Sequence, residues 1–513
     1  MAAVTVQDLP VIDTDVLVVG AGPTGLMAGL VLARRGIPAV VIDSKAGPTQ
    51  ESRAVAVQAR SMEIYDQLGL AQEVLTGGNP AARMQMGQST QLLGFSLAST
   101  QEGSTDFPGI QIFEQSRNEE LLSSALDEAG EPVQWRTRLL TVVQNDAAND
   151  SSVEALAEGP EGLFRIRSSW CIGADGAGST IRQEIGASFA GVTNHATFYV
   201  GDLRGVSGLP ENTLATRFGD ESFAVLLPLG PDGHGRIISM VPDETVGEDS
   251  ALARARSELG IDYERVDWFS SYRVHHRVAS RFRRGGMFLA GDAGHVHSPV
   301  GGQGMNTGLQ DAHHLANLLA DVVHGHLEFE AVDRYEEERR PVALKLVRVT
   351  DRAFGIVARR GRAISLLRRA FGAIMARLAP RVLRGSLGSR VGGLLGQYRI
   401  RYRFSPPGTA PKWAEDTIVG LRLPRVGNNL EALRSFTWQL HTYGRGEAAR
   451  PSIVPDWFDG PIRFGPDPYG RLRSDRLYII RPDGYIAAAI PVTDGTADDT
   501  ELRSSLRTHR IVH

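Results

Sequence analysis

The chain has 513 residues, a formal net charge of −4, and 42% hydrophobic and 22% charged residues. This composition is typical of a globular protein of several domains and excludes a disordered, collagen-like or coiled-coil chain. The nearly neutral charge gives no reason to expect nucleic acid or a membrane as a partner. The single cysteine, Cys171, cannot form an internal disulfide, so a reducing, cytoplasmic location is expected.

A strand, a helix and a second strand are predicted near the N-terminus. Residues 14–20 (TDVLVVG) are a β-branched run that ends in glycine, which indicates a buried strand, and residues 23–35 have apolar residues at helical spacing. Residues 38–43 (PAVVID) predict the second buried strand. This βαβ order predicts an α/β domain with a parallel sheet.

The middle of the chain alternates between helical and strand patterns. Residues 57–70 and 117–129 have helical spacing, and short alternating runs in residues 190–275 predict a mainly antiparallel sheet. A buried strand is predicted at 287–291 and a long helix at 303–323.

The C-terminal third begins with an arginine-rich segment. Apolar residues recur at helical spacing among the arginines of residues 352–403, which indicates amphipathic helices with a solvated basic face; a surface for an anionic partner is the alternative. Residues 404–411 (FSPPGTAP) are typical of a linker. Residues 412–513 predict a separate small α/β domain with a strand at 477–480 and a turn at 482–484.

The segment between the first strand and the first helix, residues 20–25 (GAGPTG), fits the pattern GxGxxG. Gly20 permits the tight turn, Gly22 lets the backbone approach a pyrophosphate, and Gly25 lets the helix pack closely on the strand. Asp43, at the end of the second strand, can accept hydrogen bonds from a ribose. A dinucleotide site is predicted, with NAD and FAD both open. The alternative, a purely structural glycine turn, leaves Asp43 unexplained.

Two further stretches carry a family resemblance. Residues 170–182 read WCIGADGAGSTIR, and residues 285–314 read GGMFLAGDAGHVHSPVGGQGMNTGLQDAHH. The first contains a DG motif (Asp175-Gly176), and the second contains a GD motif (Gly291-Asp292) followed by a proline-glycine loop. Together with the glycine turn, these motifs resemble those of the class A flavoprotein monooxygenases, the p-hydroxybenzoate hydroxylase-like aromatic hydroxylases. The resemblance extends over most of residues 14–345.

The resemblance implies a division into three domains. A Rossmann-like FAD-binding domain is expected in residues 1–75, 111–190 and 276–403, an interleaved, mainly antiparallel substrate-binding domain in 76–110 and 191–275, and a thioredoxin-like C-terminal domain in 404–513. The last of these has no cysteine and cannot perform thiol redox chemistry. A structural or dimer-contact role is therefore expected for it, and a homodimer is left open.

The resemblance also implies which residues bind FAD. Asp292 is expected at the ribityl chain, and Asp175 and Gly176 near the pyrophosphate and the route by which NADPH approaches. An ion pair of Asp175 with Arg182 that caps a turn is the alternative there, and helix capping is the alternative for Asp292. The full expected set is Gly20, Gly22, Pro23, Thr24, Gly25, Asp43, Ser44, Arg53, Gln115, Leu139, Asp175, Gly176, Arg182, Gly291, Asp292, Pro299, Gly302, Gly304, Met305 and Asn306.

Pro299, Gly301, Gly302 and Gln303 are expected to position the flavin ring, and no acid–base residue is assigned. A glycine loop that runs into a helix offers N–H donors and a positive helix end to the N1 and C2-carbonyl edge of a reduced flavin. A plain helix cap is the alternative. The nearby histidines are expected to cap and pack, and no metal is expected. His314 departs from the family, in which many members carry Asn, and this puts the local packing in question.

The resemblance implies hydroxylation of a phenolic or polycyclic aromatic substrate by O2 through a flavin C4a-hydroperoxide, with NADPH as a transient co-substrate. Residues 51–70 and the C-terminal extension resemble the polyketide-tailoring branch, which acts in antibiotic biosynthesis. Baeyer–Villiger oxygenation of a related polyketide and a non-catalytic flavin-binding scaffold are the alternatives. The candidate substrate contacts are Phe198, Phe223, Val225 and Leu227, and ordinary core packing is the alternative for each.

Overall fold

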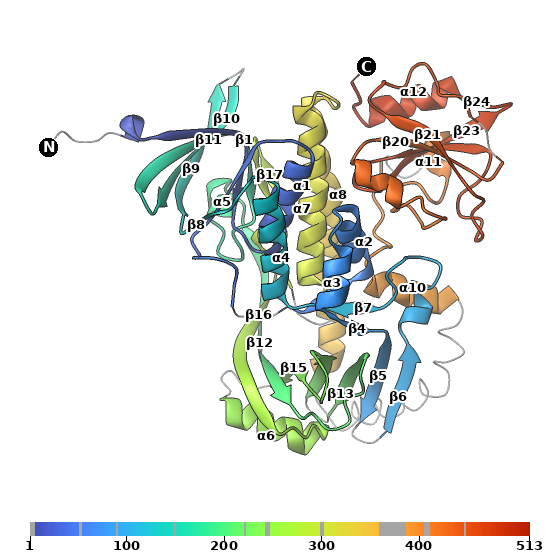
Figure 1. Ribbon diagram of the computed structural model, residues 1–513. Helices are drawn as coiled ribbons and strands as arrows, with labels where there is room; N and C mark the ends of the chain where they lie inside the picture. Colours follow the sequence, from blue (N-terminus) through green and yellow to red (C-terminus); the bar gives the residue numbers. More distant parts are fainter. Residues whose placement is uncertain are drawn as a thin grey trace.

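The computed structural model describes residues 6–50, 54–88, 91–147, 150–219, 222–241, 247–297, 302–358, 386–404, 411–445 and 448–512. Within these ranges the strands form two sheets of eight strands, one of five and one of three. Figure 1 shows the first eight-stranded sheet at the upper left, the second at the bottom and the C-terminal sheet at the upper right. The predicted α/β class is confirmed.

The first sheet contains the predicted βαβ unit. Its order is β17 (Arg283–Arg284), β18 (Met287–Leu289), β11 (Gly162–Gly173), β1 (Val11–Val19), β2 (Ala39–Asp43) and β8 (Gln134–Trp135), and β10 (Asp150–Gly159) and β9 (Arg138–Ala147) extend it from β11. β1 pairs in parallel with both β2 and β11. The carboxyl ends of β1 and β2 therefore lie at one edge, where ligands bind in sheets of this kind.

Three helices pack together beside this sheet: α1 (Pro23–Arg34), α4 (Gln115–Glu128) and α7 (Gly304–Val323). The residues of α1 from Gly25 to Leu32 are all buried, because α1 lies between the sheet and its two neighbours. A Cβ on Gly308 would lie 2.3 Å from Thr24 Oγ1, so a glycine is needed where α7 approaches the first turn of α1. The shorter helices here are η1 (Val6–Asp8), α5 (Thr180–Glu184), η3 (Gly291–Ala293) and η4 (Phe329–Val332), and α8 (Asp333–Ala358) follows them.

The second sheet is antiparallel except where β5 pairs with β13. Its order is β19 (His295–Val296), β16 (Arg265–Ala279), β12 (Phe189–Arg204), β15 (Gly235–Val241), β14 (Phe223–Pro228), β13 (Thr213–Phe218), β5 (Arg83–Gln88) and β6 (Gln91–Ser96). α6 (Glu248–Leu259) covers one face, where its Leu252 packs in one core with Leu226 and Ile237. The opposite face packs on the small sheet described next, because Leu214 and Leu227 form one cluster with Ala56, Ala81 and Ile110.

A small sheet joins the two large ones. It consists of β3 (Ala56–Gln58), β7 (Ile110–Ile112) and β4 (Asn79–Ala81). The helix predicted at 57–70 was therefore placed too early, since α2 (Ala59–Gln67) begins only after β3. Residues 56–58 are all buried and pair with β7, so long-range strand pairing overrides the helical spacing. The helices nearby are α3 (Ala71–Gly77), η2 (Ala98–Thr100) and α10 (Ser386–Leu395).

The C-terminal sheet has the order β21 (Asp459–Phe464), β20 (Gln439–Tyr443), β22 (Arg476–Ile480), β23 (Ile486–Thr493) and β24 (Thr496–Ala497). α11 (Lys412–Glu415), η5 (Glu431–Ser435) and α12 (Asp499–Thr508) accompany it. The predicted strand at 477–480 corresponds to β22, and the predicted turn is present, closed by a hydrogen bond from Gly484 N to Arg481 O of 2.8 Å. The thioredoxin-like assignment and the three domain boundaries stay predictions.

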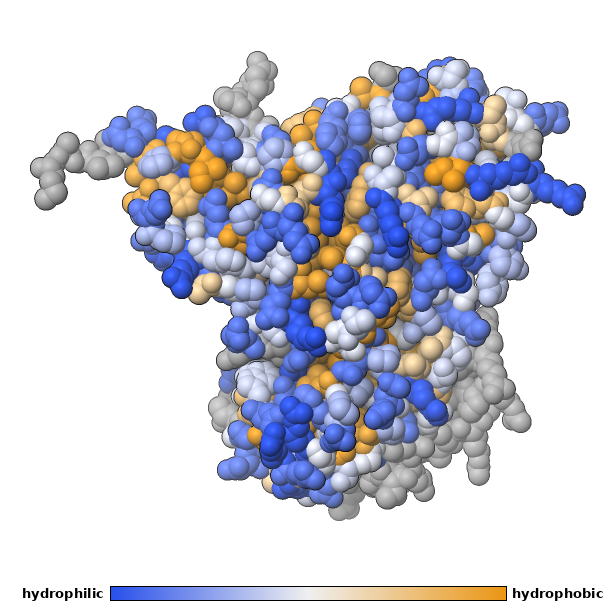
Figure 2. Space-filling model, viewed as in Figure 1, coloured by the Kyte–Doolittle hydropathy of each residue, from blue (hydrophilic) through white to orange (hydrophobic). Residues whose placement is uncertain are grey.

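Hydrophilic residues cover most of the face shown in Figure 2, and apolar residues form small separate patches on it. Across the described ranges, none of the helices has both the length and the apolar composition that a membrane span requires. Residues 359–385, most of the arginine-rich segment, lie outside the described residues.

Candidate active site

In the glycine turn, the packing of the protein requires glycine at positions 20 and 25 but leaves room for a side chain at position 22. Gly20 has φ +102°, and a Cβ there would lie 2.3 Å from Ala174 O; a Cβ on Gly25 would lie 1.8 Å from Gly20 O. Gly22 has φ −80°, and no protein atom lies within 4 Å of an added Cβ. The open space at Gly22, next to the N-terminus of α1, fits a bound pyrophosphate.

Asp43 holds the glycine turn in place. Its Oδ2 accepts a hydrogen bond of 2.6 Å from Ala21 N, and its Oδ1 accepts one of 2.8 Å from Lys45 N. A carboxylate offers about four lone-pair sites, so ribose hydroxyls can still bind to it. Asp43 thus has a structural task in addition to the predicted one, while the neighbouring Ser44 is exposed.

A buried carboxylate that the sequence did not single out joins this edge to α4. Glu119 is 1% exposed at its side chain and binds Lys45 Nζ at 3.0 Å. Its other oxygen accepts a hydrogen bond of 3.0 Å from Gln115 Nε2, one of the expected FAD contacts. The i to i+4 spacing of Gln115 and Glu119 was visible in the sequence, but their partner Lys45 comes from a separate strand end. Leu139 on β9 is half-buried against the main core.

The GD motif lies against the glycine turn. Gly291 has φ +60°, and a Cβ on it would lie 2.6 Å from Thr24 Oγ1. Asp292 is exposed to solvent but surrounded by so much protein that lost hydration raises the pKa of its carboxyl. No side-chain cap forms at η3, so helix capping does not explain Asp292. An accessible carboxylate inside the protein, next to the pyrophosphate turn, fits the hydroxyl-rich ribityl chain of FAD.

The DG motif is tied to the GD motif by the side chain of Arg182, which donates to a backbone carbonyl. Asp175 Oδ2 accepts hydrogen bonds from Thr180 N at 2.7 Å and Ile181 N at 3.2 Å, which caps the start of α5. Arg182 donates to Ala293 O at 2.9 Å and Ala177 O at 2.7 Å, and its guanidinium lies 3.9 Å from the ring centre of Phe189. Arg182 therefore orders the two motifs relative to each other, whereas Asp175 orders the DG segment itself. Gly176 has φ +77°, as a tight turn requires.

The loop expected to position the flavin ring, residues 299–303, is called the flavin loop below. It is described only at its C-terminal end, because Pro299 and Gly301 lie outside the described residues, as does Arg53. Asn306 is fully buried and fixes this end to β3. Its Oδ1 accepts from Gln58 N at 2.8 Å, and its Nδ2 donates to Ala56 O at 2.7 Å and Gly302 O at 2.8 Å. The Asn306 amide thus places the loop. Of the other expected residues, Gly304 begins α7, Gln303 is buried and Met305 packs against the main core.

Three of the four candidate substrate contacts lie together. Phe198 and Phe223 form one buried cluster with Met240 and Val274, their rings meeting edge-on at 6.3 Å, and Val225 packs against it. Leu227 belongs to an adjacent cluster with Val55 and Ala56, next to the flavin loop. Val225 contacts both clusters, so they form one continuous apolar wall.

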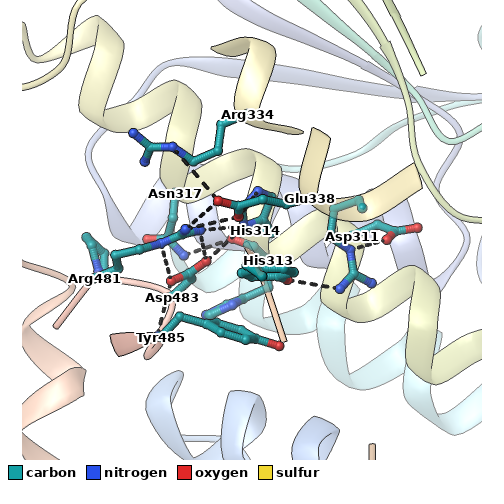
Figure 3. A network of polar contacts seen from close by, with 12 residues as sticks. Asp311, His313, His314, Asn317, Arg334, Glu338, Arg481, Asp483 and Tyr485 are labelled. Atoms are coloured by element: carbon teal, nitrogen blue, oxygen red, sulfur yellow. Dashed lines mark hydrogen bonds and ion pairs between the residues drawn. The ribbon is translucent and has the colours of Figure 1, made fainter. Parts of the chain in front are cut away.

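Two buried polar networks on α7 were not predicted (Figure 3). In the first, Asp311 binds Arg339 at 2.6 Å and His295 at 2.7 Å. In the second, His314 Nδ1 lies 2.8 Å from Asp483 Oδ2 in the C-terminal turn. This contact explains why a histidine stands at position 314, where many family members carry Asn. The His314 side chain binds the C-terminal turn and lies away from the edge of the first sheet at which β1 and β2 end. The partners lie far apart in sequence, so no local pattern could have revealed them.

Known proteins are similar to this chain in sequence and in structure. Residues 13–350 match the family model described as "FAD binding domain". The chain is 31% identical to 6-methylpretetramide 4-monooxygenase of Streptomyces rimosus, over 92% of this chain and 90% of the relative. It is 31% identical to para-nitrophenol 4-monooxygenase of Pseudomonas sp. (strain WBC-3), over 65% of this chain and 85% of the relative.

A solved structure agrees over nearly the whole length. The OxyS anhydrotetracycline hydroxylase from Streptomyces rimosus superposes with a TM-score of 0.76 at 26% identity, covering 97% of this chain and 99% of that one. The match includes the C-terminal sheet as well as the cofactor edge. On the strength of the family model and of relatives that span both chains, this protein belongs to the FAD-dependent class A flavin monooxygenases.

Proposed function

We propose that this monooxygenase hydroxylates a phenolic or polycyclic aromatic compound of the polyketide type, with NADPH as the reductant. In the balanced reaction an aromatic C–H becomes C–OH, O2 supplies that oxygen and one water, and NADPH supplies the two electrons. The observation that carries the proposal is the apolar aromatic wall of the second sheet.

This wall is turned toward the FAD-binding part of the molecule. Val274 of the wall and Val278 of the main core lie four residues apart on β16, and so on one face of the strand. Val278 pairs with His295, and β19 leads directly into the flavin loop. An aromatic ring placed between wall and loop would be shielded from water on its apolar side.

The chain's own residues prepare the site for this chemistry. Bound FAD supplies hydride acceptance and oxygen activation. The N-terminus of α7 follows the flavin loop and is fixed to β3 by Asn306. Its free N–H groups and positive helix end would stabilise negative charge on the reduced flavin ring. Phe198 and Phe223 are buried within the wall, and the partly buried Val225, Ile238 and Tyr272 pack against them and offer apolar surface to a flat ring.

The named relatives act on 6-methylpretetramide, para-nitrophenol and anhydrotetracycline, which supports an aromatic substrate. The same wall would also accept a ketone of similar shape, so Baeyer–Villiger oxygenation stays the second candidate. We further propose a cytoplasmic location, the three domain boundaries given above, and a structural or dimer-contact role for a thioredoxin-like C-terminal domain.

The test is anaerobic reduction of the holoenzyme by NADPH, with and without a panel of phenols and polycyclic aromatics, followed by aerobic turnover. We expect one compound to speed flavin reduction several-fold and to give a phenolic product heavier by one oxygen atom. A lactone or ester product heavier by one oxygen would establish the Baeyer–Villiger alternative. NADPH oxidation with no oxygenated product from any compound would contradict both and favour a flavin-binding scaffold.

A further inference from the structure

Asp311 is the centre of a buried network beneath the GD motif. It lies in the second turn of α7, and its side chain is 1% exposed. Oδ2 accepts hydrogen bonds from Gly291 N at 3.2 Å and from His295 Nε2 at 2.7 Å. Oδ1 accepts from Arg339 Nε at 2.6 Å.

One carboxylate thus holds the GD motif at two points. Gly291 immediately precedes Asp292, so the hydrogen bond from its N–H to Asp311 helps to fix this turn, in which Gly291 has a φ of +60°. His295 begins β19, which runs into the flavin loop. A shift of Asp311 would therefore move both the ribityl-binding carboxylate and the start of the loop.

Arg339 keeps Asp311 in this position. Its guanidinium is fully buried and also donates to Tyr402 Oη at 3.0 Å and Thr307 O at 3.3 Å. Burial opposes ionisation of Asp311, but the charges and hydrogen bonds of Arg339 and His295 together outweigh it and lower the pKa of the carboxyl to about 2. A buried ion pair adds little net stability compared with apolar packing. The geometry that this pair imposes is the better explanation for its presence.

We propose that Asp311 is a positioning residue for FAD, which sets the Gly291–Asp292 turn through its hydrogen bonds, with Arg339 as the group that orients it. Asp311 does not touch the cofactor. The proposal rests on FAD binding alone and is independent of which substrate the enzyme oxidises.

The same helix offers a matched control. Asp321 is also buried on α7, with its side chain 3% exposed, and it pairs with Arg35 at 2.6 Å and accepts from Trp438 Nε1 at 2.8 Å. It differs from Asp311 in lying near the other end of α7, away from the GD motif. Asp311→Asn and Asp321→Asn therefore remove equivalent buried charges at different distances from the cofactor.

The experiment measures the FAD dissociation constant of each apoprotein, the midpoint potential of the bound flavin and the Tm of the apoprotein. We expect Asp311→Asn to weaken FAD binding by tenfold or more and to shift the potential. Asp321→Asn should lower Tm to a similar degree and keep the FAD dissociation constant within about twofold of wild type. Equal FAD affinity in both variants would overturn the proposal.

A milder variant decides the question if Asp311→Asn does not fold. Tyr402→Phe removes only the hydroxyl to which Arg339 donates. FAD binding several-fold weaker than wild type, at an apoprotein Tm no lower than that of Asp321→Asn, would support the proposal. Wild-type affinity and potential in Tyr402→Phe would contradict it.

Discussion

His314 on α7 and Asp483 in the turn after β22 are 169 residues apart in sequence, yet His314 Nδ1 lies 2.8 Å from Asp483 Oδ2. Arg481 pairs with both Asp483 at 2.6 Å and Glu338 of α8 at 2.9 Å. All four side chains are buried. The C-terminal sheet is thus attached to the helix that begins at the flavin loop by an ionic network shielded from solvent.

Asp483→Asn is expected to destabilise the protein far more than Asp475→Asn. Both aspartates pair at 2.6 Å with an arginine two residues earlier, but Asp483 is 4% and Asp475 46% exposed at the side chain. Removing one partner of a buried pair costs about 3–5 kcal/mol, and an exposed pair contributes about 0–1 kcal/mol. Denaturant unfolding measures both free energies. Similar losses in the two variants would show that burial of this network does not matter.

His313→Gln is expected to flatten the loss of stability in mild acid. Burial lowers the pKa of His313 from 6.5 to about 3. The unfolded chain therefore takes up this proton first, and stability falls as the pH drops from 6.5 toward 3; at pH 5 the effect of one such group is about 2 kcal/mol. Glutamine can still donate to Gln67 Oε1, the partner of His313 at 3.0 Å.

The measurement for this variant is the free energy of unfolding, obtained by denaturant titration at several pH values between 7 and 5. His324→Gln is the control, because His324 lies exposed at the end of the same helix, where lost hydration also lowers its pKa but less than that of His313; its effect on the pH slope should be smaller. An unchanged pH slope in His313→Gln would mean that other groups cause the acid sensitivity.

Gly22→Val is expected to prevent stable FAD binding while leaving the apoprotein folded. Gly22 and Gly247 are both N-cap residues with extended backbone, at φ −80° and −74°, and neither has a protein atom within 4 Å of an added Cβ. A side chain at Gly22 would fill the space assigned to the pyrophosphate. Gly247→Val should bind FAD as wild type does, by fluorescence titration. A fully yellow Gly22→Val protein would refute that assignment.

Phe198→Leu is expected to raise the KM for the aromatic substrate several-fold and to leave FAD affinity unchanged. The control is Phe269→Leu, because Phe269 packs against the core on the opposite, α6-covered face of the same sheet. Phe198 is fully buried and Phe269 only partly buried, so Phe198→Leu should lose more stability, and the comparison rests on KM and not on stability. Steady-state kinetics with the substrate identified by flavin reduction separates the two. A KM effect of equal size in both variants would argue against a substrate site on this wall.

The sequence by itself determined the cofactor edge. GxGxxG followed by a β-strand ending in Asp43, the DG motif and the GD motif are local patterns, because each uses the backbone of one continuous segment. The βαβ order and the parallel pairing of β1 with β2 followed from the same stretch. Where the structure differed, at β3, a strand pairing with residues more than fifty positions away replaced a helical pattern.

Only the tertiary structure decided what stabilises and orients that edge. Asp311 meets Arg339 across 28 positions, Lys45 meets Glu119 across 74, and His314 meets Asp483 across 169. These pairs owe their strength to burial, which depends on how α7, α8 and the C-terminal sheet pack. Charge and residue type are visible in a sequence, but whether a charge is solvated or enclosed is settled only when distant segments come together.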